Sequence, residues 1–119
     1  MPVRSLRSPV LKWPPEAEVV AALRRWARDL DLPGLVALGY CGSYARGEAG
    51  VGSDLDRVLI VEQSDQPQPL RAVGLPLETL PVPADALVLT HSEWEALKGG
   101  GGRFANTLLR EARWILGPP

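Results

Sequence analysis

The stretch GSYARGEAGVGSDLDRVLIV, from Gly42 to Val61, decides how this chain folds. A Gly-Ser pair follows one apolar run, Leu35 to Cys41, and two aspartates, Asp54 and Asp56, stand at the head of another. Continuous apolar runs of this length are typical of strands covered on both faces. The glycine-rich segment between the two runs predicts a crossing connection. We therefore expect strands at about 35 to 41 and 56 to 62, with polar groups gathered where they meet.

The spacing of the two aspartates indicates a cation site. Alternate residues of a strand project to the same side, so Asp54 and Asp56 are expected on one side of the strand with their α-carbons about 6 to 7 Å apart. Carboxylates that close repel each other unless one is protonated or a cation lies between them. Mg²⁺ suits such a site, because it is commonly held by one or two carboxylates together with phosphate oxygens and water.

The Gly-Ser pair offers the other half of a nucleotide site. Gly42 permits backbone angles and a close ligand approach that a β-carbon would obstruct. If Ser43 to Arg46 opens a short helix, its first amides and positive dipole end would face an anion, and the Ser43 hydroxyl could add a donor. The segment thus combines a predicted phosphate cradle with a predicted metal pair.

These residues carry a family resemblance. GSYARGEAGVGSDLD resembles the nucleotidyltransferase signature of the DNA polymerase beta superfamily, and its Ala-Arg-Gly-Glu continuation resembles the minimal nucleotidyltransferases, or MNT proteins. The resemblance implies an α/β fold, with a small mixed β-sheet of three or more strands and helices packed on it, like the palm of polymerase beta. It also implies a third carboxylate on a later strand, for which Asp85, at the start of the apolar run 84–90, is the match.

By this resemblance Asp54, Asp56 and Asp85 are the catalytic residues and hold two Mg²⁺ ions, one for the attacking hydroxyl and one for the triphosphate. Gly42, Ser43 and Arg46 would bind the nucleotide, with ATP as the expected substrate. Two alternatives remain open for Arg46, which could meet a phosphate or pair with Glu48.

The family also implies a partner. Minimal nucleotidyltransferases typically occur with small helical HEPN proteins, in toxin and antitoxin pairs in which the nucleotidyltransferase is the antitoxin. The acceptor would then be a hydroxyl of that partner protein, a tyrosine for example, and the transferred group AMP. Three alternatives stay open: a binding module that neutralises a helical partner without catalysis, a small-molecule transferase like the aminoglycoside nucleotidyltransferases, and assembly as a homo-oligomer.

Length and composition narrow the remaining classes. With 119 residues, 45% of them hydrophobic, the chain makes one small domain, expected at 16–117 after an extended, proline-rich arm at 1–15. The formal net charge of −1 provides no basic field for nucleic acid, so templated polymerisation is not expected. A single cysteine, Cys41, excludes an internal disulfide, and the lack of a signal peptide or long apolar segment predicts a cytoplasmic protein that does not insert in a membrane.

The flanking segments predict helices. Apolar residues recur at helical spacing from Val19 to Leu30, ahead of Pro33-Gly34. Five prolines between Gln63 and Pro83 limit any helix there to a short one, at most from Leu70 to Leu80 with a break near Pro76.

The C-terminal third follows a strand expected at 85–90. The pattern Ser92-x-x-Glu95 predicts a capping box that opens a helix through Lys98. The glycines 99–102 predict a non-helical connector, and the apolar residues from Phe104 to Ile115 predict one amphipathic helix.

Arg57 follows Asp56 and is expected to point to the opposite face of the strand. We expect its side chain to form a salt bridge, or to pack its stem along the sheet with its head in water, in preference to contacting a substrate.

Overall fold

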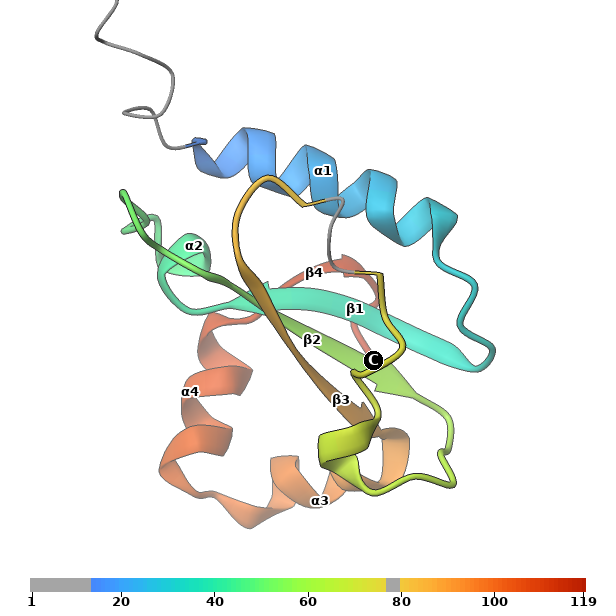
Figure 1. Cartoon of the computed structure of the whole chain (residues 1–119). Coiled ribbons are helices and arrows are strands. Elements are labelled where there is room, and N and C mark those ends of the chain that lie inside the picture. Colours follow the sequence, from blue (N-terminus) through green and yellow to red (C-terminus); the bar gives the residue numbers. More distant parts are fainter. Residues whose placement is uncertain (1–13, 77–79) are drawn as a thin grey trace, which may run out of the picture.

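A four-stranded mixed sheet with helices on both faces forms the molecule (Figure 1). The structure is a computed structural model that describes residues 14–76 and 80–119. The strands are β1 (Leu35–Cys41), β2 (Leu55–Val61), β3 (Ala84–Thr90) and β4 (Arg113–Leu116), in the order β3-β2-β1-β4. β1 pairs antiparallel with β2 and β4, and β2 pairs parallel with β3. The predicted α/β class and mixed sheet are confirmed, whereas the predicted arm lies almost wholly outside the described residues.

Two helical layers enclose the sheet. On one face lies α1 (Glu16–Asp29), and on the other lie α3 (His91–Gly100) and α4 (Arg103–Glu111) (Figure 1). A four-residue helix, α2 (Ser43–Arg46), follows β1, and a 3-10 turn, η3 (Gln68–Leu70), follows β2. Among the described residues no helix has the length and apolar character needed to span a membrane.

The alternation of β2 divides the core into two halves. Leu55 and Leu59 belong to the half under α1, together with the α1 side chains at helical spacing, Val19, Ala22, Leu23 and Trp26. Val58 and Ile60 belong to the half under α3 and α4, packed with Trp94 and Leu108. Side chains of β2 therefore alternate between two enclosed layers, as the apolar run predicted.

The C-terminal helix prediction is wrong beyond Glu111. α4 ends there, Ala112 takes extended backbone angles, and residues 113–116 form β4 against the free edge of β1. Gly39 of β1 makes room for this strand, because a β-carbon there would come within 3.0 Å of the Trp114 ring and the Arg113 carbonyl. Pairing with an open sheet edge, which is a tertiary effect, outweighs the local helical spacing.

The start of α3 also differs from the sequence prediction. Thr90 caps the helix by accepting from the Glu93 backbone N–H, and the Glu93 carboxylate accepts from the Thr90 N–H, so the capping box is Thr90-x-x-Glu93 and not Ser92-x-x-Glu95. The helix also continues through Gly100, and only the last two glycines connect it to α4. Gly101, with φ of 71°, supplies the left-handed cap that ends it.

The short helix expected at 70 to 80 is absent from the described part of that segment. η3 is followed by turns to Pro76, and residues 77–79 lie outside the described residues. The chain is held there by Arg71, which donates to the Val88 carbonyl at 3.0 Å and to Glu93 at 2.6 Å. Contacts of one side chain with β3 and α3 thus take the place of a regular helix.

Candidate functional site

Three side chains form a row across the sheet at one end of its α3 and α4 face. Cys41 of β1 pairs with Asp56 of β2, and Asp56 pairs with Asp85 of β3. Residues paired across neighbouring strands project to the same face, so the three lie next to one another. The expectation that the strand of Asp85 adjoins the strand of Asp56 is met by the parallel pairing of β2 and β3.

Electrostatic repulsion acts on Asp56. Partial burial raises the pKa of its carboxyl above the usual range, and the charges of Asp85 and Asp54 raise it further, while Arg46 acts in the opposite direction. Asp54 precedes β2 and reaches Asp56 from the connection between α2 and that strand. Asp54 and Asp85 are therefore both close enough to act on the Asp56 carboxyl.

The donor set fits a hard divalent cation in its chemistry. Carboxylate oxygens from neighbouring strands are the ligands that Mg²⁺ prefers, and a cation would relieve the repulsion at Asp56. In residues 14–76 and 80–119, however, no three His, Cys, Asp or Glu side chains converge closely enough to hold an ion as they lie. Asp56 and Asp85, which pair across β2 and β3, are adjacent in the sheet and could share one.

Gly42 is fitted tightly against the acids. Its φ of 80° and ψ of −154° lie in a region that side-chain-bearing residues avoid, and a β-carbon would come within 3.0 Å of Asp56 Oδ2. Gly42 is also the residue from which α2 begins, since its carbonyl accepts from the Arg46 N–H at 3.1 Å. The residue from which α2 starts therefore lies against the Asp56 carboxylate.

Arg46 takes one of the two alternatives left open for it. Its Nε donates to Glu48 at 2.9 Å, and its Nη1 donates to Glu111, at the end of α4, at 3.1 Å. Its side chain is still 41% exposed, so these pairs do not enclose it. Glu111 was missed by sequence reasoning, because its contact depends on how α4 packs, which no local pattern records.

Cys41 was also missed as a neighbour of the acids. Burial raises the pKa of its thiol to about 11, and the charges of Asp56 and Glu111 add to this. A thiol with so high a pKa is a poor nucleophile near neutrality. The sequence did offer a signal for this: Cys41 directly precedes Gly42, so the last residue of that strand was expected to lie near the acids.

The prediction for Arg57 is half right. It does point to the face opposite Asp56, but its head is not in water: the residue is 1% exposed, and its guanidinium lies 4.6 Å from the centroid of the Trp26 ring. Its Nε donates to the Asp85 carbonyl at 3.3 Å, and its two terminal nitrogens have no hydrogen-bond partner among the described residues. Stacking on the aromatic face of Trp26 offsets part of the cost of burying the guanidinium.

A groove adjoins the row of acids. It has a volume of about 360 Å³ and is bounded by the row itself, by Val58 and Leu87 below it on the same strands, and by Phe104 of α4. Volumes of about 300 to 1,000 Å³ are usual for small-molecule sites. Phe104 is 58% exposed.

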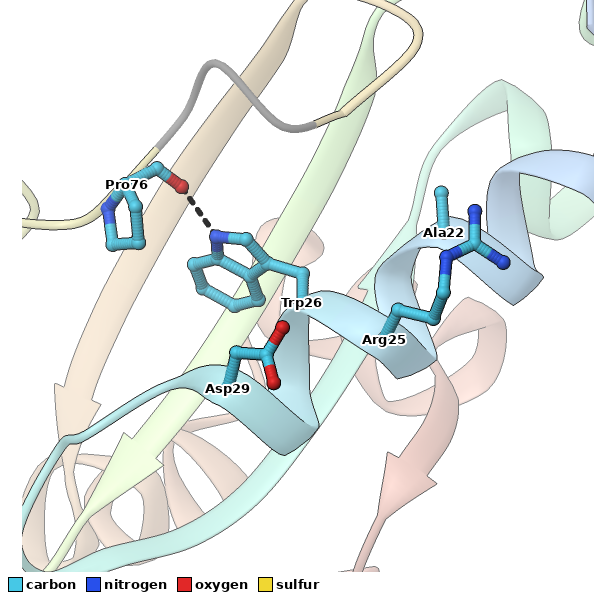
Figure 2. Close-up of a pocket in the computed structure, with 5 residues that line it drawn as sticks. All are labelled: Ala22, Arg25, Trp26, Asp29 and Pro76. Atoms are coloured by element: carbon cyan, nitrogen blue, oxygen red, sulfur yellow. Dashed lines mark hydrogen bonds between the residues drawn. The ribbon is translucent and has the colours of Figure 1, made fainter.

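A second hollow, of about 370 Å³, lies on the other side of the sheet, between α1 and Pro76 (Figure 2). The Trp26 indole N–H donates to the Pro76 carbonyl beside it. Arg25 and Asp29 border it as well, but the paired carboxylates lie on the opposite face of the sheet. We therefore take the groove beside Asp56, and not this hollow, as the candidate functional site.

The geometry agrees with the family to which the sequence belongs. Residues 23–114 match the nucleotidyltransferase domain family, more than three quarters of the chain, so the chain is a member of that family. Domains of this family transfer nucleotidyl groups and typically use a nucleoside triphosphate and a divalent metal.

A solved structure shows the same fold. A protein from Sulfolobus solfataricus, described in its 1.40 Å crystal structure as a candidate nucleotidyltransferase, superposes with a TM-score of 0.60 over 84% of this chain and 81% of its own. The two sequences are 14% identical, so the likeness concerns the fold. A comparison with curated proteins found no significant match.

Proposed function

We propose that this chain transfers AMP from ATP to a hydroxyl of a partner protein, with Mg²⁺ held by the aspartates. One observation carries the proposal: Asp56 and Asp85 stand in register on adjacent parallel strands, with Gly42 directly against Asp56. Family membership supports nucleotidyl transfer in general, and the choice of ATP, magnesium and a protein acceptor goes beyond it.

The chain's own residues have distinct parts in this reaction. Gly42 and Ser43 would bind the β- and γ-phosphates through the backbone amides at the start of α2. Asp54, Asp56 and Asp85 would hold Mg²⁺, which when bound neutralises phosphate charge and eases ionisation of the acceptor hydroxyl. The hydroxyl oxygen forms a bond to the α-phosphorus as the bond to pyrophosphate breaks, and its proton passes to a carboxylate of the pair.

The partner proposal rests on the resemblance to the minimal nucleotidyltransferases. A bound nucleotide would need cover beyond the one sheet and the helices that the structure describes. A small helical protein of the HEPN type could supply that cover and the acceptor, in a toxin and antitoxin pair with this chain as antitoxin. A second copy of the chain is the competing arrangement.

A binding module without catalysis is the second candidate, and one observation favours it. In the described part of the chain the aspartates do not form a ready three-ligand cluster. The chain would then neutralise the partner by binding to it, without catalysis by the aspartates.

The test combines labelled transfer with neutralisation. ATP labelled at the α-phosphate, MgCl₂ and the product of a neighbouring gene are incubated with the wild-type chain, with Asp56→Asn, and with Asp65→Asn, an exposed loop control. We expect label on the partner with the wild type and the control and at least a hundredfold less with Asp56→Asn. Full neutralisation by Asp56→Asn without label would favour the binding module, and undiminished label with that variant would refute the catalytic assignment.

A further inference from the structure

The two edge strands of the sheet differ in what covers them. At β3, Arg71 donates to the Val88 carbonyl at 3.0 Å, so the segment after β2 already occupies a backbone acceptor of that strand. At the other end of the sheet, β4 pairs with β1 and with no other strand in the part of the chain that the structure describes. Alternate backbone N–H and C=O groups of β4 therefore face away from the sheet and can pair with an added strand.

A groove with a volume of about 330 Å³ lies between this open edge and α1. Its apolar lining consists of Ala27, Ile115 and Leu116. The pairing of β4 with β1 skips Ile115, between the paired residues Trp114 and Leu116, so β4 has an extra residue there. Such a bulge can re-aim a side chain, and two successive residues of β4 border the same groove. Leu116 remains 45% exposed, so the apolar lining is only partly covered.

Two arginines of α1 border the same groove. Arg24 and Arg28 are exposed, and neither forms an ion pair within residues 14–76 and 80–119. They stand four residues apart, a spacing at which like charges on a helix repel each other. The groove therefore combines an apolar lining with two positive charges that have no acidic partner in the described structure. That combination suits an occupant that is both apolar and acidic.

Charge also distinguishes between the possible occupants. A second copy that added its own β4 to this edge would bring the same two arginines to the interface, and like charges across an interface are unfavourable. Residues 1–13 include Arg4, Arg7 and Lys12 and no acidic residue, so this segment of the chain has the wrong charge as well. An acidic segment of another protein meets both requirements.

We propose that the groove between α1 and β4 binds an extended acidic segment of a partner protein, which adds a strand to the open edge of β4. The backbone of the segment pairs with β4, while its apolar and acidic side chains contact the groove lining and the two arginines of α1. Ile115 packs on the α1 half of the core, whereas Asp56 projects to the opposite face of the sheet. The docking surface is therefore separate from the row of acids, and the inference does not depend on nucleotidyl transfer.

The experiment uses two capped peptides of one design, Glu-Thr-Val-Thr-Glu and Lys-Thr-Val-Thr-Lys, in which the valine and the charged residues share one face of a strand. Each peptide is titrated into the ¹⁵N-labelled chain, and the shifts and hydrogen exchange of the β4 amides are measured. The test variant, Arg24→Glu, removes one positive charge and places an acid four residues before Arg28, where the two can pair. Its matched control is Arg25→Glu, an equal change of charge at an exposed position of the same helix that does not line the groove.

We expect the acidic peptide to shift the amides of Arg113–Leu116 and to slow their hydrogen exchange, and the basic peptide to do neither. Arg24→Glu should raise the Kd of the acidic peptide at least fivefold, whereas Arg25→Glu should change it less than twofold. Equal binding of the two peptides, no binding of either, or equal effects of the two variants would overturn the inference.

Two further outcomes concern the mode of binding. Peptide binding that shifts amides of α1 without slowing exchange in β4 would contradict strand addition. Self-association in sedimentation equilibrium, with slowed exchange in β4 before any peptide is added, would assign the edge to a second copy and overturn the proposal. No nucleotide is present in these measurements, so a failure here is distinguishable from a failure of the proposed transfer reaction.

Discussion

The contact between Gly42 and Asp56 gives the most decisive test of the site. In Gly42→Ala the new β-carbon would come within 3.0 Å of Asp56 Oδ2, at a backbone conformation that only glycine adopts readily. The backbone cost is about 1 to 3 kcal/mol. Displacing the carboxylate adds about 1 to 3 kcal/mol, the usual cost of overpacking.

Gly47 is a reference for the cost of a positive φ alone, whereas Gly42 combines a positive φ with a ψ of −154°, which adds to its backbone cost. Gly47 also has a positive φ, 73°, in the left-handed region, and a β-carbon there would meet no atom within 4 Å. Gly47→Ala should therefore lower the free energy of unfolding by only about 1 to 2 kcal/mol. Urea denaturation of both variants, at equal ionic strength, measures the difference.

A double variant isolates the steric part. Asp56→Ala removes the atoms that the new β-carbon approaches most closely, Oδ2 and Cγ, and leaves only Asp56 Cβ at 3.8 Å. In a cycle of Gly42→Ala and Asp56→Ala we expect a coupling free energy of at least about 1 kcal/mol, because the second substitution relieves the first. The folded fraction of Gly42→Ala should also lose about a hundredfold in label transfer, since a misplacement of about 1 Å is enough for that. Additive free energies, with equal costs at Gly42 and Gly47, would show that Gly42 does not hold the carboxylate in place.

Three further outcomes follow from charged groups. The raised pKa of Asp56 means that the folded state binds the carboxyl proton more tightly than the unfolded state, so the contribution of Asp56 to stability falls as pH rises through the folded pKa. Asp56→Asn should therefore raise the thermal midpoint at pH 7 and should reduce the decrease of the midpoint with pH above pH 4. MgCl₂ should stabilise the wild type but not this variant. Arg57 is buried against Trp26, so Arg57→Met, which puts an apolar chain of similar volume in place of a buried charge, should change the free energy of unfolding by less than about 1 kcal/mol. Arg57→Ala should cost about 2 to 4 kcal/mol in urea denaturation. Equal losses for the two variants would show that the charge, and not the packing, provides the stabilisation. Hydrogen bonds from Arg71 and the Thr90 N–H lower the pKa of Glu93 to about 2, so its stabilisation is fully present above pH 4.5 and is lost as pH falls through 2. Glu93→Gln should cost about 1 kcal/mol at pH 7, discounted for a side chain that is 41% exposed, and less than half of that at pH 2, as followed by thermal unfolding across that range.

The central part of the fold could be predicted because its signals are local. The apolar runs that became β1 and β2, the glycine between them and the aspartates at the head of β2 all lie within 27 residues, from Leu35 to Val61. The position of Asp85 needed one more step, the parallel pairing of β2 with β3, which the resemblance supplied. Periodicity alone could not have put these two strands side by side.

The elements that were mispredicted depend on contacts between distant segments. Residues 113–116 have helical spacing with α4, yet they pair with β1, because its edge would otherwise expose unpaired backbone groups and Gly39 leaves space for Trp114. Arg57 was expected in water because arginine is seldom fully buried, and the sequence gives no sign that Trp26, 31 positions earlier, covers it. In both cases the deciding partner lies in another element of the fold.

Two residues of the site contribute unfavourably to the stability of the fold. Partial burial raises the pKa of Asp56 and the neighbouring carboxylates raise it further, and Gly42 adopts a backbone conformation that residues with a side chain avoid. A single substitution, Asp56→Asn, would remove the repulsion without changing the shape of the residue, so packing alone gives no reason for an acid at this position. Local unfavourable features of this kind are expected where a ligand supplies the missing stabilisation. These two features support the proposal that a cation binds beside Asp56 and Asp85 and that a phosphate approaches the backbone of Gly42.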